Sequence, residues 1–202
     1  MKKTFSALMA IMMVLMMFTA NAETAVATQE PAFEYDFKTF LWGASKEEVI
    51  AVEGIPDIDS KRDGVDAEFI GYETEAVGLD VALTYSFCDD GLYDVTYMLT
   101  ETHSNEELYI DDYNTFKKAL IKKYGEPMVD VERWSDDSKK EYYADRKGDA
   151  LCYGYLQYVT LWSLDRTALG MMMSADNYEI STIVVYLSKE ISPGEADFSD
   201  DI

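Results

Sequence analysis

The sequence predicts an α+β protein of two tandem units, each a helix packed on an antiparallel meander of three or more strands. Three observations lead to this prediction. Residues 79–99 have the alternation of a β-hairpin with one apolar face. Two helical segments end in Gly-x-Pro, and the order of helix and strands occurs twice. Because the apolar face of a sheet must be buried against another layer, each helix is expected to cover a meander.

The register of the hairpin follows from its side chains. A two-residue loop at Asp90-Gly91 would mix apolar and polar residues on one face, whereas a three-residue loop at 89–91 separates them. The longer loop pairs Phe87 with Tyr93, and it gathers one apolar set: Val81, Leu83, Tyr85, Phe87, Tyr93, Val95, Tyr97 and Leu99. A slip of one residue would turn every side chain to the opposite face, so the clean separation favours the longer loop. Gly91 would then adopt the left-handed conformation that closes such a loop.

Residues 1–22 have the three parts of a signal peptide. Lys2 and Lys3 precede an apolar run over 7–18, and Ala20-Asn21-Ala22 supplies a cleavage pattern. The run is shorter than the roughly 20 apolar residues that span a bilayer. The sequence therefore predicts export, to the periplasm or the medium, without membrane insertion after cleavage.

The remaining chain divides into four predicted segments. Residues 23–35 form a flexible leader, residues 36–103 the first unit, residues 104–188 the second unit and residues 189–202 an acidic disordered tail. In the first unit, Ser45 and Glu48 form a capping box for a helix over about 46–53, which Gly54 and Pro56 end; a strand over 67–72 and the hairpin follow.

The second unit begins with a longer helix, from a start signal at Ser104 through about Tyr124. Its apolar stripe consists of Tyr109, Tyr113, Phe116, Leu120 and Tyr124. Gly125-Glu126-Pro127 ends this helix. Three strands are then predicted over about 155–164, 167–174 and 179–188.

One motif resembles a known group of proteins. Trp42-Gly43-x-Ser45-x-x-Glu48-Val49, followed by Gly54-x-Pro56 and an aromatic hairpin with an Asp-Gly turn, resembles exported modules of the SmpA/BamE-like and β-lactamase-inhibitor-like kind. The resemblance covers about residues 37–190, and many secreted bacterial proteins of unassigned role share it. It implies a small exported scaffold that binds other proteins through its sheet or loops. The chain departs from the assembly lipoprotein in lacking a lipobox cysteine, and only one helix per unit is evident.

The net charge of the chain restricts the classes of partner that it is expected to bind. The net charge is −22, and removal of the signal peptide leaves 15 of the 17 basic residues against 39 acidic ones. Such a surface repels nucleic-acid phosphates and anionic lipid headgroups. It favours a cationic protein partner or divalent cations, or it serves solubility alone.

The sequence offers no recognisable catalytic or cofactor-binding set. The lone His103 has no companion ligands for zinc, and no nucleophile motif or phosphate loop occurs. Residues 57–66 have the carboxylate density of a calcium loop but lack the EF-hand spacing. Met171, Met172 and Met173 would alternate between the faces of a strand, so they cannot converge on a copper ion. No cofactor is predicted.

Aromatic residues between the second helix and the last meander are the candidate binding residues. They are Trp134, Tyr142, Tyr143, Tyr153, Tyr155 and Tyr158. Exposed rings would form a platform for a protein or a sugar, whereas buried rings would belong to the core. Cys88 and Cys152 form a disulfide, which the oxidising environment of an exported protein would favour, or they remain two free thiols.

Taken together, these features predict an exported, non-catalytic protein that binds a protein partner, as an inhibitor or as an envelope-associated scaffold. A calcium- or carbohydrate-binding surface module is the first alternative, and a hydrolase without a recognisable motif is the second.

Overall fold

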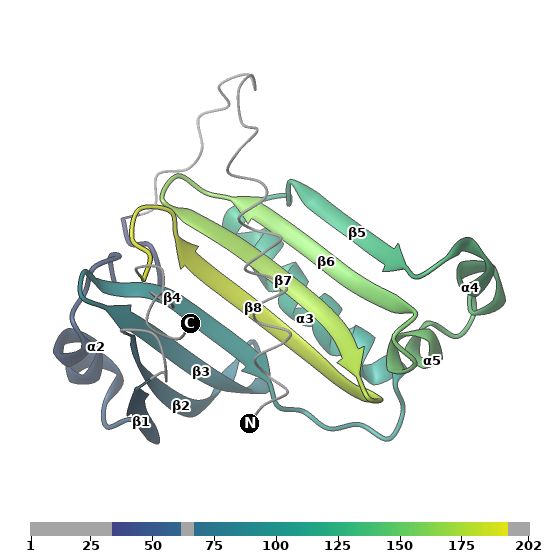
Figure 1. The fold of residues 1–202 in the computed structure, drawn as a ribbon, viewed down its shortest axis with the longest axis horizontal. Helices are drawn as coiled ribbons and strands as arrows, with labels where there is room; N and C mark the ends of the chain where they lie inside the picture. The colour runs from purple at the N-terminus through teal and green to yellow at the C-terminus, as the bar shows by residue number, and fades with distance from the viewer. Residues whose placement is uncertain (1–33, 62–66, 194–202) are drawn as a thin grey trace, which may run out of the picture.

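The computed structural model describes residues 34–61 and 67–193, in which eight strands form one antiparallel sheet (Figure 1). The helices are α2 (Lys46–Glu53), α3 (Glu107–Tyr124), α4 (Asp137–Tyr142) and α5 (Lys147–Cys152). The strands are β1 (Ile58–Lys61), β2 (Glu68–Ala76), β3 (Leu79–Cys88), β4 (Gly91–Leu99), β5 (Val129–Trp134), β6 (Leu156–Ser163), β7 (Thr167–Asp176) and β8 (Glu179–Ser188). The predicted signal peptide lies outside the described residues.

The strand order corrects the predicted architecture. The order is β1-β2-β3-β4-β8-β7-β6-β5, and the central pair β4 and β8 places Tyr97 opposite Val184. The α+β class is correct, but the prediction of two tandem helix-on-meander units is wrong, because all strands belong to a single sheet. An unpaired strand edge exposes backbone N–H and C=O groups, and β4 and β8 satisfy theirs by pairing with each other. The sequence pattern of each meander does not show which edges meet.

Two strands of the sheet were not predicted from the sequence. β1 and β5 are the two edges of the sheet, and all four β1 residues are exposed. In β5, the four residues from Asp130 to Arg133 are likewise exposed. Alternation of polar and apolar residues arises where one face is buried, so exposed edge strands carry little of the signal by which strands are recognised.

The predicted hairpin register holds except near its turn. Tyr85 pairs with Val95 and Leu83 pairs with Tyr97, as expected. A register shift between Ser86 and Phe87 then pairs Phe87 with Leu92 instead of Tyr93, so the bulge lies inside the strand rather than in the loop. A bulge admits one extra residue on one strand and keeps the register beyond it.

Gly91 is held next to the segment that precedes α2. The Gly43 N–H donates to the Leu92 carbonyl, and the Leu92 N–H donates to the Ala44 carbonyl, both at 2.9 Å. A Cβ on Gly91 would lie 2.3 Å from the Gly43 carbonyl oxygen, and its φ is +92°. Position 91 therefore requires glycine for two reasons: its left-handed conformation and the close approach of the two backbones.

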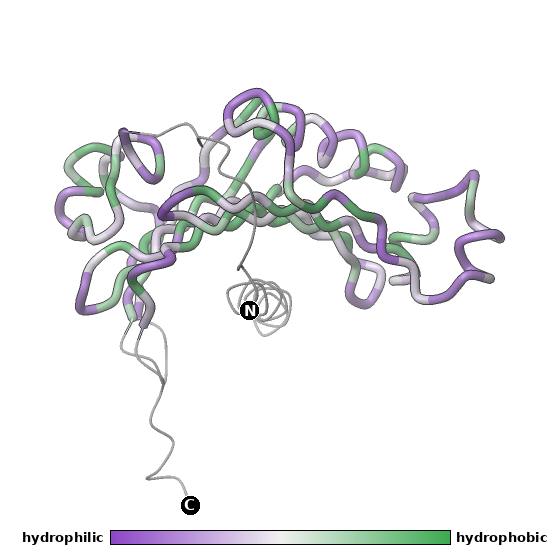
Figure 2. The backbone as a smooth tube through the Cα atoms, turned by 90° about the horizontal axis from the view of Figure 1, so that it is seen from above, coloured by the Kyte–Doolittle hydropathy of each residue, from purple (hydrophilic) through white to green (hydrophobic). Residues whose placement is uncertain are grey.

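The helices bury one face of the sheet. Figure 2 shows α2 and α3 on the same side of the sheet. Val49 of α2, Phe116 and Leu120 of α3 and Leu151 of α5 belong to one core cluster with the inward side chains of both halves of the sheet. The predicted bounds of α2 and its Ser45–Glu48 capping box are confirmed, and α3 ends at Tyr124 as expected.

The segment that contains Phe37 packs against both halves of this core. The Phe37 ring lies 5.8 Å from that of Tyr85, 5.7 Å from that of Tyr97 and 4.9 Å from that of Tyr186. These tyrosines come from β3, β4 and β8. The segment therefore packs across the line where the two sets of strands meet.

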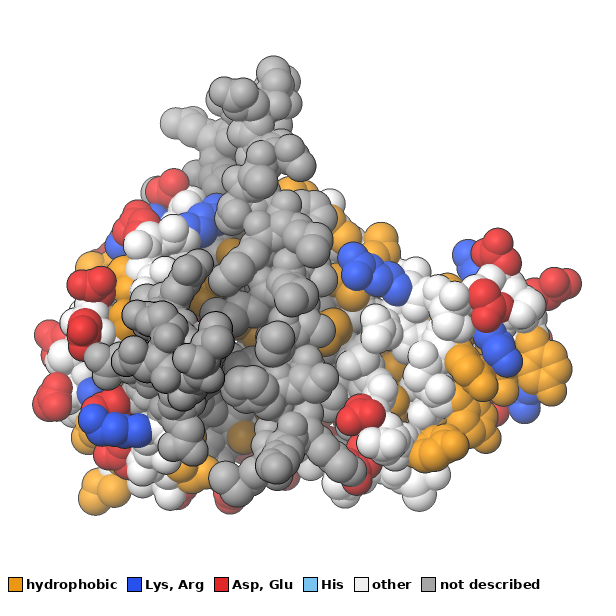
Figure 3. All heavy atoms as spheres, in the orientation of Figure 1, with side chains coloured by type: hydrophobic (Ala, Val, Ile, Leu, Met, Phe, Trp, Pro, Cys, Tyr) orange, Lys and Arg blue, Asp and Glu red, His pale blue; other side chains and the backbone are white. Residues whose placement is uncertain are grey.

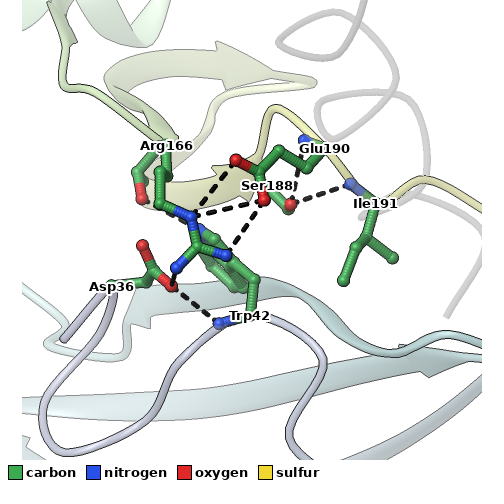
Figure 4. A network of polar contacts seen from close by, with 7 residues as sticks. Asp36, Trp42, Arg166, Ser188, Glu190 and Ile191 are labelled. Atoms are coloured by element: carbon green, nitrogen blue, oxygen red, sulfur yellow. Dashed lines mark hydrogen bonds and ion pairs between the residues drawn. The ribbon is translucent and has the colours of Figure 1, made fainter.

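Arg166 ties this segment to the end of the described chain (Figure 4). Its guanidinium pairs with Asp36 and with Glu190, each at 2.9 Å, and Asp36 also accepts the Trp42 N–H at 2.8 Å. The Ile191 N–H donates to the Ser188 hydroxyl. Residues 189–191, which the sequence assigned to the acidic tail, thus bond to the last strand and to the β6–β7 turn.

The opposite face of the sheet carries a second apolar cluster, contributed by β6, β7 and β8. Its members are Val159, Leu161, Met172, Ile183 and Val185. Met172 lies in this cluster, whereas Met171 and Met173 lie in the first. The three methionines alternate between faces, as predicted.

Candidate functional site: a tyrosine patch beside α4 and α5

The candidate site lies where the chain leaves β5 and forms two short helices at one end of the sheet (Figure 1). The Asp136 carboxylate caps α4 by accepting the Lys139 N–H at 2.9 Å. Hydrogen bonds from the Ser138 hydroxyl and the Lys139 N–H lower the pKa of Asp136. This cap fixes where α4 begins, and hence where Tyr142 and Tyr143 lie.

α5 is fixed by its contact with the start of α3. The Gly148 N–H donates to the Glu107 carboxylate at 2.6 Å. A Cβ on Gly148 would lie 2.7 Å from the Glu107 backbone nitrogen, so only glycine permits this approach. The contact places Tyr153, which follows α5, beside the turn between β7 and β8.

Five tyrosine rings meet at this corner and form the tyrosine patch: Tyr142, Tyr143, Tyr153, Tyr155 and Tyr178. Ring centroids of Tyr143 lie 4.8 Å from Tyr142, 5.6 Å from Tyr155 and 6.2 Å from Tyr153. Tyr153 lies 5.9 Å from Tyr178 in an edge-to-face arrangement. Each ring therefore contacts at least one other, at separations typical of favourable aromatic pairs.

The outer rings of the patch are exposed. Tyr142 is 69% exposed, Tyr153 51% and Tyr178 70%. Tyr143 and Tyr155 are half-buried and pack against the main core. Figure 3 shows hydrophobic side chains gathered beside basic ones at this end of the molecule. The patch is thus anchored on the core by two rings and presents three to solvent.

Two basic side chains lie over rings of the patch. The Lys139 ammonium is 4.3 Å from the centroid of Tyr155. The Arg146 guanidinium lies 5.3 Å from the centroid of Tyr142 and 5.1 Å from that of Tyr143. These distances are those of cation–π contacts, in which the negative face of the ring attracts a cation.

Four of the six predicted aromatic residues belong to the patch, and two do not. Tyr158 is buried against Tyr113, with 5.4 Å between ring centroids, and burial raises the pKa of its hydroxyl. Its place in the core follows from its position on β6, where it faces α3. Trp134 is half-buried at the end of β5 and donates from its indole N–H to Glu132 at 3.3 Å.

Tyr178 was not among the aromatic residues predicted from the sequence. Its signal was weak, because a single tyrosine after Asp176-Asn177 reads as the start of a strand. The structure shows a two-residue turn at Asn177-Tyr178 between the paired residues Asp176 and Glu179. The turn brings the ring back to Tyr153, which is 25 residues away in the sequence.

The two cysteines are free and lie at opposite ends of the sheet. The Cys88 thiol contacts the Gly91 carbonyl, near the end of β8, whereas the Cys152 thiol contacts the Tyr178 carbonyl, at the start of β8. Ten residues of β8 separate the two positions, a span of about 30 Å. A disulfide requires Cα atoms within about 7 Å, so this fold leaves no disulfide between them.

The remaining candidate residues lie elsewhere. His103 contacts Asp112 at 2.6 Å and packs edge-on against Tyr109. Asp59 pairs with Lys46, and Asp57 accepts the Glu73 N–H. The other carboxylates of the calcium-like segment, at 63 and 66, lie outside the described residues. Within residues 34–61 and 67–193, no three His, Cys, Asp or Glu side chains are arranged to hold a metal ion.

No protein family, curated protein or solved structure matches this chain. The resemblance to exported inhibitor-like and assembly-lipoprotein-like modules therefore stays a prediction. Within the part of the chain that the structure describes, no helix has both the length and the apolar character to cross a membrane.

Proposed function

We propose that this chain is an exported, non-catalytic binding protein that holds a partner protein at the tyrosine patch. The observation that carries the proposal is the patch itself: five rings in continuous contact, three of them more than half exposed. Tyrosine supplies a large contact area and loses little conformational entropy on binding, and it is enriched with arginine among residues that dominate protein interfaces.

The ring planes favour a protein over a carbohydrate. A sugar ring stacks on an aromatic face, and a flat glycan chain stacks best on several rings whose faces lie in one plane. Neighbouring rings of the patch meet at 74° between Tyr142 and Tyr143 and at 87° between Tyr153 and Tyr178. Edges and faces are thus presented alternately, which suits the mixed side chains of a protein.

A crosslinking experiment tests the proposal. A photoreactive amino acid is placed at Tyr142 or, as a control, at Tyr35, which is also exposed but lies far along the chain from the patch. Each protein is incubated with the exported proteins of the source organism at low salt. We expect a crosslinked product from position 142 and none from position 35.

Capture measurements complete the test. The double variant Tyr142→Ser/Tyr153→Ser should lose the captured protein, and Tyr35→Ser should retain it. Because none of these substitutions changes the net charge, loss in the double variant alone assigns binding to the rings. Equal capture by the wild type and the double variant would refute the proposal, and so would an absence of capture at low salt.

A further inference from the structure

Two hairpin turns of the sheet have two consecutive residues of positive φ but differ in which residues occupy these positions. In the β2–β3 turn, Val77 and Gly78 have φ of 53° and 82°; in the β7–β8 turn, Asn177 and Tyr178 have 49° and 67°. Turns with two left-handed residues favour Asn, Asp or Gly at both positions. Glycine thus occupies the second position of one turn, whereas a bulky aromatic residue occupies it in the other, where a Cβ is strained.

Packing within the fold does not account for Tyr178. Its side chain is 70% exposed, so it removes little apolar surface from water. Within the described residues, its ring contacts that of Tyr153, itself half exposed. Val77 is also strained and exposed, but it belongs to no cluster of rings. A strained residue that persists beside an exposed cluster is typical of a functional position.

The surroundings of these two rings attract positive charge. The Cys152 thiol lies beside the Tyr178 carbonyl, and its pKa is raised by burial and, to a smaller extent, by the carboxylates of Glu106 and Asp149. Elsewhere in the patch, Lys139 and Arg146 already lie over ring faces. The whole chain has a net charge of −22. Ring faces on a chain of strongly negative net charge form a favourable environment for an ammonium or guanidinium group.

We infer that Tyr178 is a binding residue and that Tyr153 and Tyr178 together receive a lysine or arginine side chain of the partner protein. The inference rests on the proposed function and specifies the chemistry of the partner. Tyr178 is then retained at a turn position that favours glycine because its ring extends the patch toward this cation.

Substitutions at the two turns test the inference. Tyr178→Gly should leave the melting temperature unchanged or raise it, because the left-handed strain is removed. The same variant should weaken binding of a fluorescently labelled tetra-arginine peptide at pH 7 and low salt by at least about fivefold. Tyr178→Phe keeps the ring and should keep the affinity. Val77→Gly relieves strain in the matched turn and should not change the affinity.

Every one of these variants keeps the net charge, so non-specific attraction of the peptide is constant across the series. A labelled tetra-glutamate peptide should not bind. A lower melting temperature for Tyr178→Gly with unchanged tetra-arginine affinity would overturn the inference, since the ring would then be structural. Tighter binding of an uncharged oligosaccharide than of tetra-arginine would also overturn it.

The partner-capture measurement separates this inference from the proposed function. If Tyr142→Ser/Tyr153→Ser loses the captured protein while Tyr178→Gly retains both the protein and the peptide, the patch binds a partner and the role of Tyr178 is refuted. If the double variant also retains the captured protein, the proposed function fails.

Discussion

Two clusters of aromatic rings in this protein have similar internal geometry and opposite surroundings. Around Phe37, the rings of Tyr85, Tyr97 and Tyr186 lie 4.9–5.8 Å away, and all four side chains are buried. In the tyrosine patch, the centroid separations run from 4.8 Å to 6.2 Å, and three of the five rings are more than half exposed.

The comparison shows that contacts between rings do not by themselves distinguish a core from a binding surface. Burial of apolar area contributes about 25 cal/mol per Å², whereas the specific geometry of an aromatic pair adds only about 0.5–1.5 kcal/mol. The cluster around Phe37 therefore stabilises the fold, while the exposed patch leaves its area available to a partner.

The largest expected effect comes from disturbing the close backbone contact between Gly91 and Gly43. Gly91→Ala should destabilise the protein by up to about 5 kcal/mol, because a left-handed alanine costs about 1–2 kcal/mol and displacing the Gly43 backbone, which lies 2.3–2.8 Å from the added Cβ, costs about 1–3 kcal/mol more. Urea unfolding measures the loss.

Gly78→Ala is the matched control for this substitution. Gly78 also has a positive φ, of +82°, but a Cβ there would meet nothing within 4 Å. It should cost only the conformational part, about 1–2 kcal/mol. Equal losses for the two variants would mean that the Gly43–Gly91 approach does not constrain the fold.

A direct comparison of the two clusters comes next in size. Phe37→Ala should cost about 3–4 kcal/mol, because it removes a buried ring that contacts three tyrosines. Tyr142→Ala should cost less than about 1 kcal/mol, since its ring is 69% exposed. Similar losses in urea unfolding would contradict the assignment of one cluster to the core and the other to the surface.

The smallest effect appears as a dependence on alkaline pH. Burial, with a contribution from the Glu53 carboxylate, raises the pKa of the Tyr97 hydroxyl well above its ordinary value near 10. In the unfolded chain this hydroxyl ionises from about pH 10, while in the folded protein it stays neutral. Stability associated with Tyr97 is therefore fully present below about pH 9, begins to fall near pH 10, and approaches a loss of about 1.4 kcal/mol per pH unit well above it.

Tyr97→Phe isolates this contribution, because phenylalanine does not ionise. Between pH 10 and 11, the free energy of unfolding of the variant should decrease by about 1 kcal/mol less than that of the wild type. Below pH 9 the two proteins should show parallel pH dependence. Identical slopes above pH 10 would show that Tyr97 ionises equally in both states.

Local structure was largely predictable from the sequence. The Ser45–Glu48 capping box and Gly54 gave the bounds of α2, because capping groups interact within one turn of the chain. The alternation along 79–99 gave the pairing of Tyr85 with Val95, since a one-residue slip would have reversed both faces. Candidate rings for the patch were recognised by their density alone.

Features that depend on contacts between distant residues were decided only by the tertiary structure. The pairing of β4 with β8, which replaced two expected units by one sheet, joins edges that local patterning leaves unassigned. The burial of individual rings was also decided by the tertiary structure. Tyr158 faces α3 from β6 and belongs to the core, whereas Tyr178 reaches the patch through a turn. Periodicity reports which side of an element is apolar, and only the packing of the whole chain determines what that side meets.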